Sequence, residues 1–319
     1  MKVGFIGLGN VGGKLAGSLL RNGFDTVVND RDRSAAQKFI DKGAGWADTP
    51  KQMAEICDVV ITCLPSPKAC SEVLEGPDGI LLGLSEGKVW MEMSTTDAAE
   101  VKRIGELVRA KGAFTAECPV SGGCHRAETG NISIFVGGDR ETFEKVLPLT
   151  TTLGRRVLHT GPLGTASTLK VMTNYLATAN LLTCCEALVT MRAAGMDLAT
   201  TYEAMKISSG TSFVHETESQ LILNGSRDVN FTLDLILKDI GLFQTIAERH
   251  HVPLELSPMI IDIMKDGQDR YGERANTDDI IRRLEEATGL SILADGFPAE
   301  LIDDEPEERG YEVVPPRPS

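Results

Sequence analysis

The chain begins with Lys2-Val3-Gly4-Phe5-Ile6-Gly7-Leu8-Gly9-Asn10-Val11-Gly12, an apolar run that leads directly into a Gly-x-Gly-x-x-Gly sequence. A helix-compatible stretch, residues 14–21, follows at once. In this pattern the first glycine allows a tight turn, the second lets the backbone approach a pyrophosphate, and the third lets the helix pack closely on the strand. The helix also points its N–H groups and the positive end of its dipole at the phosphates. A dinucleotide site is therefore favoured over a purely structural glycine turn.

The residues after this loop support the same interpretation. A second apolar run, Thr26–Asn29, ends in Asp30, about 20 residues downstream, where an acceptor for a ribose 2′-hydroxyl belongs. Asp30 favours NAD because its carboxylate repels a 2′-phosphate. Arg31 and Arg33 follow immediately and are suited to bind that phosphate, so NADP remains the alternative. The predicted cofactor contacts in this region are Gly7, Leu8, Gly9, Asn10, Val11, Gly12, Asp30 and Arg31.

The composition limits the classes of protein to which the chain can belong. Its 319 residues are enough for two domains, and 42% hydrophobic with 24% charged residues is typical of a globular enzyme. Because the net charge is −14, a nucleic-acid partner, which requires a basic surface, is not expected. Part of this charge is local, since the segment 295–308 is acidic and contains no basic residue.

The cysteines and histidines indicate neither a disulfide framework nor a metal site. Seven cysteines form no Cys-x-x-Cys pair, which is typical of reduced thiols in a cytosolic protein, and the five histidines show no metal-ligand spacing. The N-terminal apolar residues belong to a glycine-punctuated strand rather than to a signal peptide. The longest apolar helix, residues 176–189, is too short to span a bilayer. We therefore expect a cytoplasmic protein with no metal and no membrane partner.

Strands and helices alternate through the first half of the chain, which predicts parallel strands joined by helical crossovers. The expected strands are short and apolar: residues 3–6, 27–29, 59–64, 89–93, 114–116 and 132–136. Helical stretches lie between them at 35–42 and 71–74, and another begins near Glu141. Residues 1–162 are therefore expected to form a doubly wound α/β dinucleotide-binding domain, a Rossmann fold.

Strand signals disappear after residue 162. A long helix is expected over residues 166–194, followed by helices at 198–208, 233–250, 257–266 and 278–286. Residues 163–290 are therefore predicted to form an all-helical substrate and dimerisation domain, which the long helix joins to the first domain. The remaining segment, 291–319, is acidic and then proline-rich. This composition favours a disordered tail, with an extended arm over a partner subunit as the alternative.

Three loops that follow strands of the first domain carry polar groups suited to a ligand. Leu64-Pro65 ends one strand, on the edge where open α/β sheets bind ligands. Ser94-Thr95-Thr96 ends another; its hydroxyls are suited to a nicotinamide or a substrate, although Asp97 after them equally predicts a helix cap. Ser121-Gly122-Gly123 offers a hydroxyl and backbone N–H groups suited to clamp a carboxylate. The alternative for this last loop is a flexible connection between two strands.

Two pairs of polar residues lie on predicted helices of the second half. Lys170 and Asn174 are four residues apart and therefore share one face of the long helix. Burying an unpaired ammonium is costly, so a functional role for this pair competes with a simple solvated face. Lys238 and Asp239 follow Phe231 into another helix and lie among apolar residues, where the alternative is an exposed ion pair.

These motifs, in this order, resemble the β-hydroxyacid dehydrogenase family, which includes 3-hydroxyisobutyrate dehydrogenase, tartronate semialdehyde reductase and, more distantly, 6-phosphogluconate dehydrogenase. The resemblance covers residues 1 to about 286. Each motif is weak by itself, and the ordered set is strong. The matching residues are Gly7–Gly12, Leu64-Pro65, Ser94-Thr95, Pro119–Gly123, Lys170 with Asn174, Phe231, and Lys238-Asp239.

The resemblance implies a role for each matching residue. Lys170 would be the catalytic general acid/base, with Asn174 holding the substrate or the lysine in place. Ser121, Gly122 and Gly123 would grip the substrate carboxylate. Asp239 would support Lys238. The residues that would lie along the nicotinamide and the substrate are Thr95, Leu64, Pro65, Phe231 and Lys238.

Two positions depart from the family pattern. Glu117-Cys118-Pro119 stands where Asp-Ala-Pro is common, and Thr165-Ala166 follows Gly164 where a further glycine is common. Neither change removes a group that the mechanism needs. Imine reductases on this scaffold usually lack a lysine at the position corresponding to Lys170, so its presence favours alcohol and carbonyl chemistry.

The sequence thus predicts an oxidoreductase that transfers a hydride between NAD, or NADP, and a short 3-hydroxy acid. The alternatives are an imine or other carbonyl reductase on the same scaffold and a non-catalytic NAD(H)-sensing protein. His125 and Arg126, just beyond the clamp, either read a second anionic or polar group of the substrate or belong to a surface loop. The long apolar helix predicts a homodimer or homotetramer.

Overall fold

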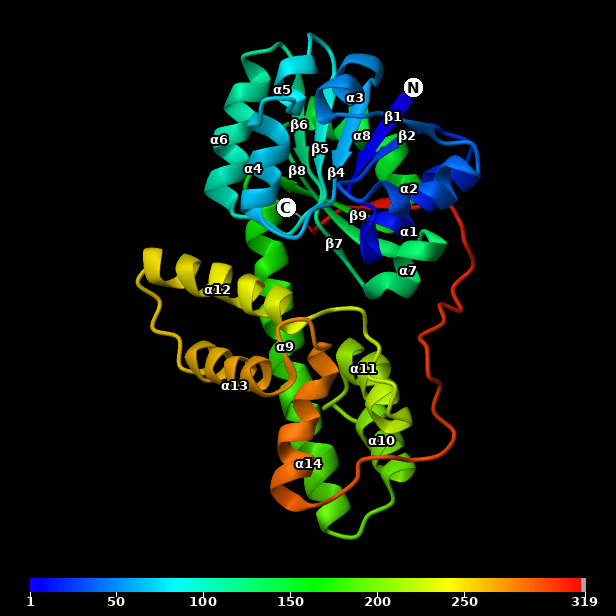
Figure 1. The fold of residues 1–319 in the computed structure, drawn as a ribbon. Helices are drawn as coiled ribbons and strands as arrows, with labels where there is room; N and C mark the ends of the chain where they lie inside the picture. Colours follow the sequence, from blue (N-terminus) through cyan, green and yellow to red (C-terminus); the bar gives the residue numbers. More distant parts are fainter. Residues whose placement is uncertain (317–319) are drawn as a thin grey trace. The chain divides into compact units, whose positions relative to one another are not determined.

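The structure, a computed structural model, describes residues 1–316 of the chain (Figure 1). It contains two compact units. Unit 1 comprises Met1–Lys170 and the C-terminal segment from Asp303 onward, and unit 2 comprises Val171–Ile302. The chain therefore leaves unit 1 at Lys170 and returns to it at Asp303.

A ten-stranded sheet forms the centre of unit 1, with nine strands in the order β10-β9-β8-β6-β5-β4-β1-β2-β3 and β7 paired to β8 outside this path. The first six strands run parallel to one another, whereas β8 is antiparallel to β6 and β7. The strand order reverses direction between β1 and β4, the place where open α/β sheets bind ligands. The strands are β1 (Lys2–Ile6), β2 (Asp25–Asn29), β3 (Gly45–Trp46), β4 (Val59–Thr62), β5 (Val89–Glu92), β6 (Phe114–Glu117), β7 (Val120–Ser121), β8 (Ile132–Gly137), β9 (Gly154–Gly161) and β10 (Tyr311–Val313).

Helices cover both faces of this sheet. One face packs against α1 (Asn10–Arg21), α2 (Arg33–Ile40) and α8 (Arg140–Leu153). The other packs against α3 (Pro50–Ile56), α4 (Pro67–Glu75), α5 (Ile80–Gly83) and α6 (Ala98–Arg109). A further short helix, α7 (Gly123–Thr129), lies beside α1.

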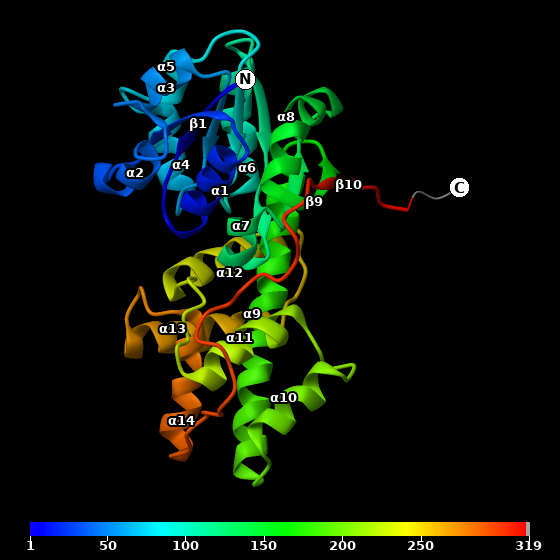
Figure 2. The same cartoon turned by 90° about the vertical axis from the view of Figure 1, so that its right-hand side faces the viewer.

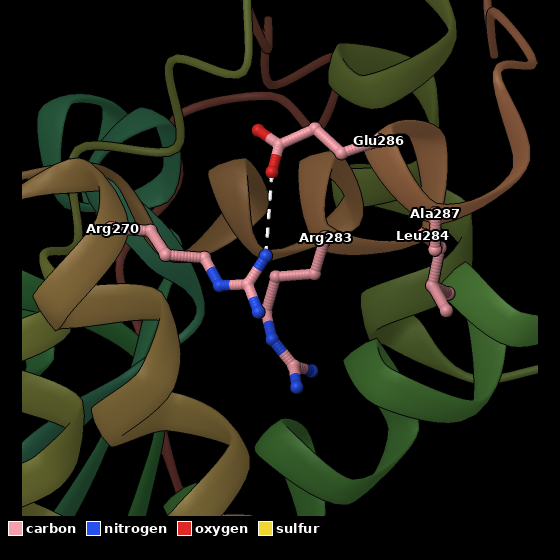
Figure 3. Close-up of a pocket in the computed structure, with 5 residues that line it drawn as sticks. All are labelled: Arg270, Arg283, Leu284, Glu286 and Ala287. Carbon is pink, nitrogen blue, oxygen red and sulfur yellow. Dashed lines mark hydrogen bonds and ion pairs between the residues drawn. The ribbon is translucent and has the colours of Figure 1, made fainter.

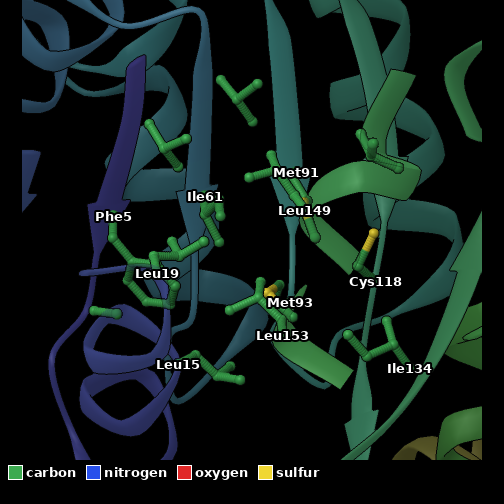
Figure 4. Packing of buried hydrophobic residues seen from close by; sticks show 14 of the residues in the cluster. Phe5, Leu15, Leu19, Ile61, Met91, Met93, Cys118, Ile134, Leu149 and Leu153 are labelled. Carbon is green, nitrogen blue, oxygen red and sulfur yellow. The ribbon is translucent and has the colours of Figure 1, made fainter. Parts of the chain in front are cut away.

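Alternate strand residues contribute to the two faces because successive side chains of a strand point in opposite directions. Phe5 and Met91 face α1 and α8, whereas Val60 and Trp90 face α3–α6. Figure 4 shows the first of these cores, which includes Phe5, Leu15, Leu19, Ile61, Met91, Met93, Leu149 and Leu153. Burial on both faces explains why the strands read as continuous apolar runs in the sequence.

Unit 2 is helical. The long helix α9 (Thr165–Ala193) begins in unit 1 and continues into unit 2. Its apolar residues, including Leu188, form a separate core with residues of the following helices such as Ile222 and Ile240. Within residues 1–316, no helix is long and apolar enough to cross a membrane. The other helices are α10 (Leu198–Lys206), α11 (Phe213–Asn224), α12 (Leu233–Arg249), α13 (Leu256–Tyr271), the 3₁₀ helix η1 (Thr277–Ile281) and α14 (Arg282–Thr288).

The predicted fold class, a doubly wound sheet domain joined to a helical domain by a long helix, is confirmed. Several elements lack a clear sequence signal, among them β9 and α11. β9 carries Arg155 and Arg156 near the edge of the sheet and so has no apolar run. The helix α11 has no strong apolar stripe from which it could have been predicted. The helix expected over residues 278–286 is present, but it is divided into η1 and α14.

The expectation of a disordered tail is wrong for residues 303–313. β10 extends the sheet of its own chain by pairing in parallel with β9, as the red segment in Figure 2 shows. The acidic residues upstream of β10 bind arginines of unit 1, which offsets their mutual repulsion. Residues 317–319 of the predicted tail lie outside the described residues.

Candidate functional site

The predicted site residues of unit 1 follow the carboxyl ends of neighbouring strands. Gly7–Gly12 follows β1, Leu64-Pro65 follows β4, and Ser94-Thr95 follows β5, and these three strands run parallel. Ser121–Gly123 follows β6, which lies next to β5 in the sheet, and includes the end of the short strand β7. Because parallel strands have their carboxyl ends at one edge, the four loops lie along the same edge of the sheet.

Close contacts explain the glycines of the first loop. Gly7 has a φ of +96°, and a Cβ there would overlap the carbonyl oxygen of Cys63. A Cβ at Gly12 would overlap the carbonyl oxygen of Gly7, so only glycine lets α1 pack this closely on β1. By contrast, a Cβ at Gly9 would meet no atom within 4 Å, and Gly9, the N-cap residue of α1, makes no side-chain cap hydrogen bond. Open space beside a glycine N-cap at a helix N-terminus fits the pyrophosphate of a dinucleotide.

Asp30 fixes the glycine loop to the end of β2. Its Oδ2 accepts a hydrogen bond from the Leu8 N–H at 2.7 Å, and its Oδ1 accepts from the Asp32 N–H at 2.9 Å. A carboxylate oxygen has more than one acceptor site, so the group retains capacity for a ribose hydroxyl. Arg31 and Arg33 are exposed, and the Arg33 guanidinium lies over the Trp46 ring, 5.2 Å from its centroid. The remaining acceptor capacity of Asp30 therefore fits the ribose hydroxyl of NAD.

A buried carboxylate holds the ends of β4 and β5 together. Glu92 Oε1 accepts a hydrogen bond from the Ser94 N–H at 2.7 Å, and Ser94 Oγ accepts from the Leu64 N–H at 2.7 Å. Burial raises the pKa of Glu92. The hydroxyl of Ser94 thus has a structural role, and half-buried Thr95 lies next to it at the sheet edge. Asp97 caps α6, as the second interpretation of this stretch predicts.

The predicted carboxylate clamp turns the chain from β7 into α7. Gly122 has a φ of +132° and Gly123 a φ of +86°, backbone conformations that favour glycine. Ser121 and Gly122 are half-buried, and Gly123 is exposed. His125 and Arg126 lie on α7, so the surface loop that was their alternative interpretation is not observed.

Lys170 is 7% exposed, which excludes the solvated-face interpretation. The start of its helix, α9, is bound by Glu117 at the end of β6. Glu117 Oε1 accepts from the N–H groups of Gly164 at 2.5 Å and Ala166 at 2.9 Å. Its Oε2 accepts from the Ser167 N–H at 3.1 Å and from the Ser167 hydroxyl. One carboxylate therefore connects the strand that leads to the clamp with the helix that carries Lys170.

Glu117 is a residue whose role the sequence pattern does not reveal. In the sequence Glu117 is only a departure from the Asp-Ala-Pro that is common in the family. However, a charged residue at the end of an apolar strand is rarely buried unless it is paired, so its position could have indicated a buried hydrogen-bond partner. Burial raises the pKa of Glu117, and the hydrogen bonds from Ser167, Ala166 and Gly164 oppose this effect.

The structure brings together Asn174, Lys238 and Asp239 in unit 2. Asp239 Oδ2 accepts a hydrogen bond from Asn174 Nδ2 at 2.5 Å, and Lys238 Nζ lies 2.7 Å from Asp239 Oδ1. Because Asp239 is 1% exposed, this is not the exposed ion pair of the alternative interpretation. Asp239 thus links α12 to α9 one turn beyond Lys170, and half-buried Phe231 precedes α12.

A separate pocket of unit 2 contains none of the predicted site residues (Figure 3). Its arginines are paired with acids: Arg270 lies 3.4 Å from Glu286 and 3.0 Å from Asp266, and Arg283 also pairs with Asp266. Among the described residues, no group of histidine, cysteine and acidic side chains is arranged to hold a metal ion. The pocket lining consists of Arg270, Arg283, Leu284, Glu286 and Ala287.

Comparison with known proteins assigns the family. Residues 2–161 match the NAD binding domain of 6-phosphogluconate dehydrogenase. Residues 164–284 match a domain described as NAD-binding of NADP-dependent 3-hydroxyisobutyrate dehydrogenase. The chain therefore belongs to the β-hydroxyacid dehydrogenase family, as its motifs predict, and unit 1 contains an NAD(P)-binding domain.

Individual relatives agree with this assignment. The chain is 30% identical to 2-(hydroxymethyl)glutarate dehydrogenase from Eubacterium barkeri, over 92% of this chain and 97% of the relative. It is also 30% identical to mitochondrial 3-hydroxyisobutyrate dehydrogenase from Mus musculus, over 82% of this chain and 81% of the relative. The solved structure of Psf3 with NADP⁺ and 2-OPP is 26% identical, covers 88% of this chain and 99% of its own, and has a TM-score of 0.83. Imine reductases share the fold at 16% identity.

Proposed function

We propose that this protein transfers a hydride between NAD(P) and the carbinol carbon of a short 3-hydroxy acid. The proposal rests on a combination of features within unit 1. The dinucleotide-type glycine loop and Ser121–Gly123 lie at one edge of the sheet. A buried lysine, Lys170, lies on the helix whose start is bound by Glu117. By their names, two relatives act on 2-(hydroxymethyl)glutarate and 3-hydroxyisobutyrate. Both compounds carry a hydroxymethyl group on the carbon that bears a carboxylate.

In this proposal Lys170 moves the proton. When bound, the nicotinamide accepts a hydride in the oxidative direction and supplies one in the reductive direction. During oxidation the neutral amine of Lys170 takes the hydroxyl proton as the C–H bond breaks, and during reduction its ammonium returns that proton to the carbonyl oxygen. Oxidation needs the neutral amine, so its rate is expected to rise with pH.

The remaining residues bind and orient. The hydroxyl of Ser121 and the backbone N–H groups of the two following glycines would bind the substrate carboxylate. Asn174, whose side-chain amide is held by Asp239, would orient the substrate hydroxyl or Lys170. Asp30 favours NAD over NADP, since its carboxylate repels a 2′-phosphate.

The experiment is a set of initial rates at 340 nm with NAD and with NADP. The substrates are 3-hydroxyisobutyrate, 2-(hydroxymethyl)glutarate, glycerate and, in reverse, tartronate semialdehyde, with lactate as a 2-hydroxy-acid control. We expect turnover of at least one 3-hydroxy acid, faster with NAD, and none of lactate. Turnover of imines alone would identify an imine reductase instead. NADH binding without turnover of any substrate would indicate an NAD(H)-sensing protein.

A further inference from the structure

The chain continues beyond the family match, which ends at residue 284, into a segment that binds unit 1. We call residues 303–313 the C-terminal strap. Its far end is anchored on the sheet, where β10 pairs with β9, Glu312 lies 2.6 Å from Arg140, and Glu308 pairs with Arg155 (Figure 2). The strap is therefore an ordered part of unit 1 that the family match does not include.

The near end of the strap binds the last turn of α7. The Asp303 carboxylate, whose side chain is 3% exposed, accepts hydrogen bonds from the Thr129 hydroxyl and from Asn131 Nδ2, the latter at 2.7 Å. Asn131 Nδ2 also donates to the backbone carbonyl of Glu305 at 2.8 Å. Burial opposes ionisation of Asp303, yet hydrogen bonds from Thr129 and Asn131 bring its pKa below the usual value. The strap thus places an ionised carboxylate at the end of α7.

The same segment binds Arg126 in the middle of α7. Glu305 Oε1 lies 3.3 Å from Arg126 Nη2, and Asp303 Oδ1 lies 4.0 Å from Arg126 Nε. The sequence makes Arg126 a candidate to bind a second anionic group of the substrate. In the structure two carboxylates of the same chain already neutralise its charge. Its guanidinium therefore belongs to the contact between α7 and the strap.

The position of α7 depends on these contacts. The helix has seven residues, too few to be stable without tertiary packing. Its first residue, Gly123, is also the last residue of the clamp, so a shift of α7 moves the backbone N–H groups of the clamp. On its other side α7 is held by α1, where Lys14 Nζ lies 2.6 Å from Glu128 Oε2. Without the strap, only the packing of α7 on α1 and β8 would hold the helix.

We propose that Asp303 and Glu305 are positioning residues for the carboxylate clamp. The strap fixes α7, and α7 fixes the backbone of Ser121–Gly123 in the geometry that binds the substrate carboxylate. The identity of that ligand rests on the proposed function. The strap thereby sets substrate affinity. We expect a smaller effect on cofactor affinity, because the glycine loop after β1 and Asp30 after β2 lie outside α7.

Kinetics of four variants test the proposal. Asp303→Ala removes the acceptor for Thr129 and Asn131. Glu305→Gln weakens the ion pair with Arg126, and with it the pair with Arg156 of β9. The matched control Glu308→Gln alters the strap only where it pairs with Arg155 of β9. We expect Asp303→Ala to raise KM for the hydroxy acid about tenfold and to change kcat and KM for NAD less than about twofold. Asp303→Asn, which retains one acceptor oxygen, should restore part of the affinity. Equal KM values in Asp303→Ala and the control would overturn the proposal.

Amide hydrogen exchange provides a readout that needs no substrate. Faster exchange confined to residues 123–131 of Asp303→Ala, and absent from Glu308→Gln, is the expected result. Unchanged exchange in α7, or faster exchange throughout unit 1, would overturn a positioning role. An inactive wild-type enzyme would refute the proposed function, and the exchange result would still decide whether the strap fixes α7.

Discussion

The buried carboxylate of Glu117 provides a quantitative test of how unit 1 holds the helix that carries Lys170. Glu117→Gln keeps the size of the side chain and one acceptor oxygen. It replaces the other oxygen by an NH₂ group where Oε2 now accepts from the N–H and hydroxyl of Ser167. The Ser167 hydroxyl can rotate to accept from the amide, but its N–H then faces another donor.

The expected loss follows from this count. A hydrogen bond to a charged group contributes about 1.5–3 kcal/mol, and a helix N-cap about 0.5–2 kcal/mol. Burial of the Glu117 carboxylate carries a desolvation cost, which is also the cause of its raised pKa. The neutral amide of glutamine avoids this cost, which offsets part of the loss. We therefore expect Glu117→Gln to lower the free energy of unfolding by about 2 kcal/mol, with a fall in Tm of about 4–8 °C.

Thermal unfolding at pH 7, followed by circular dichroism, measures this change. The matched control is Glu106→Gln on α6, an exposed glutamate paired with Arg109, for which we expect a Tm shift of less than about 1 °C. Glu117→Asp, the residue common in the family, should lose less stability than Glu117→Gln. A Tm for Glu117→Gln equal to that of the Glu106→Gln control would refute the role of the carboxylate in holding α9.

Three further substitutions test other parts of the account. Burial raises the pKa of Glu218 to about 7 and raises that of Asp278, so unit 2 loses stability as the pH rises from the ordinary carboxyl range through about 7. Asp278→Asn should therefore increase Tm more at pH 8 than at pH 5 in differential scanning fluorimetry, and a gain independent of pH would contradict this sign. Asp30→Ala should reduce the ratio of kcat/KM for NAD to that for NADP by about tenfold or more; an unchanged ratio would show that Asp30 does not select the cofactor. Asp239→Asn weakens the contact with Lys238 and should lower kcat by about tenfold, and wild-type turnover would argue against a supporting role for this carboxylate.

Local pattern was sufficient to predict most of the fold of unit 1. Residues such as Phe5, Ile61 and Met91 are buried on one face and their neighbours on the other, so each strand reads as an apolar run bounded by turn residues. Elements near the edge of the sheet, and short helices outside its main layers, were not predictable in this way. The strand β9 has arginines in place of apolar residues, and α7 is a single short helix that depends on its neighbours.

The groups that hold the site together depend on contacts between residues far apart in the sequence. Glu117 binds the Gly164 N–H, 47 residues later, and Asp303 binds Thr129, 174 residues earlier. No local periodicity records such pairs, so the sequence marks Glu117 only as a departure from the family pattern and residues 303–313 only as acidic. The proposed roles of Ser121–Gly123 and Lys170 rest on a family motif rather than on local propensity.

The Lys170→Ala variant shows whether this lysine is the general acid/base of the proposed hydroxyacid dehydrogenase. Oxidation of the best 3-hydroxy acid is followed at 340 nm, and NADH affinity is measured by fluorescence, with Lys145→Ala on α8 as the control. Loss of general acid/base catalysis predicts a fall in kcat of at least about 10²-fold with the Kd for NADH changed less than about twofold. Turnover by Lys170→Ala within about tenfold of the wild type would contradict the assignment of Lys170.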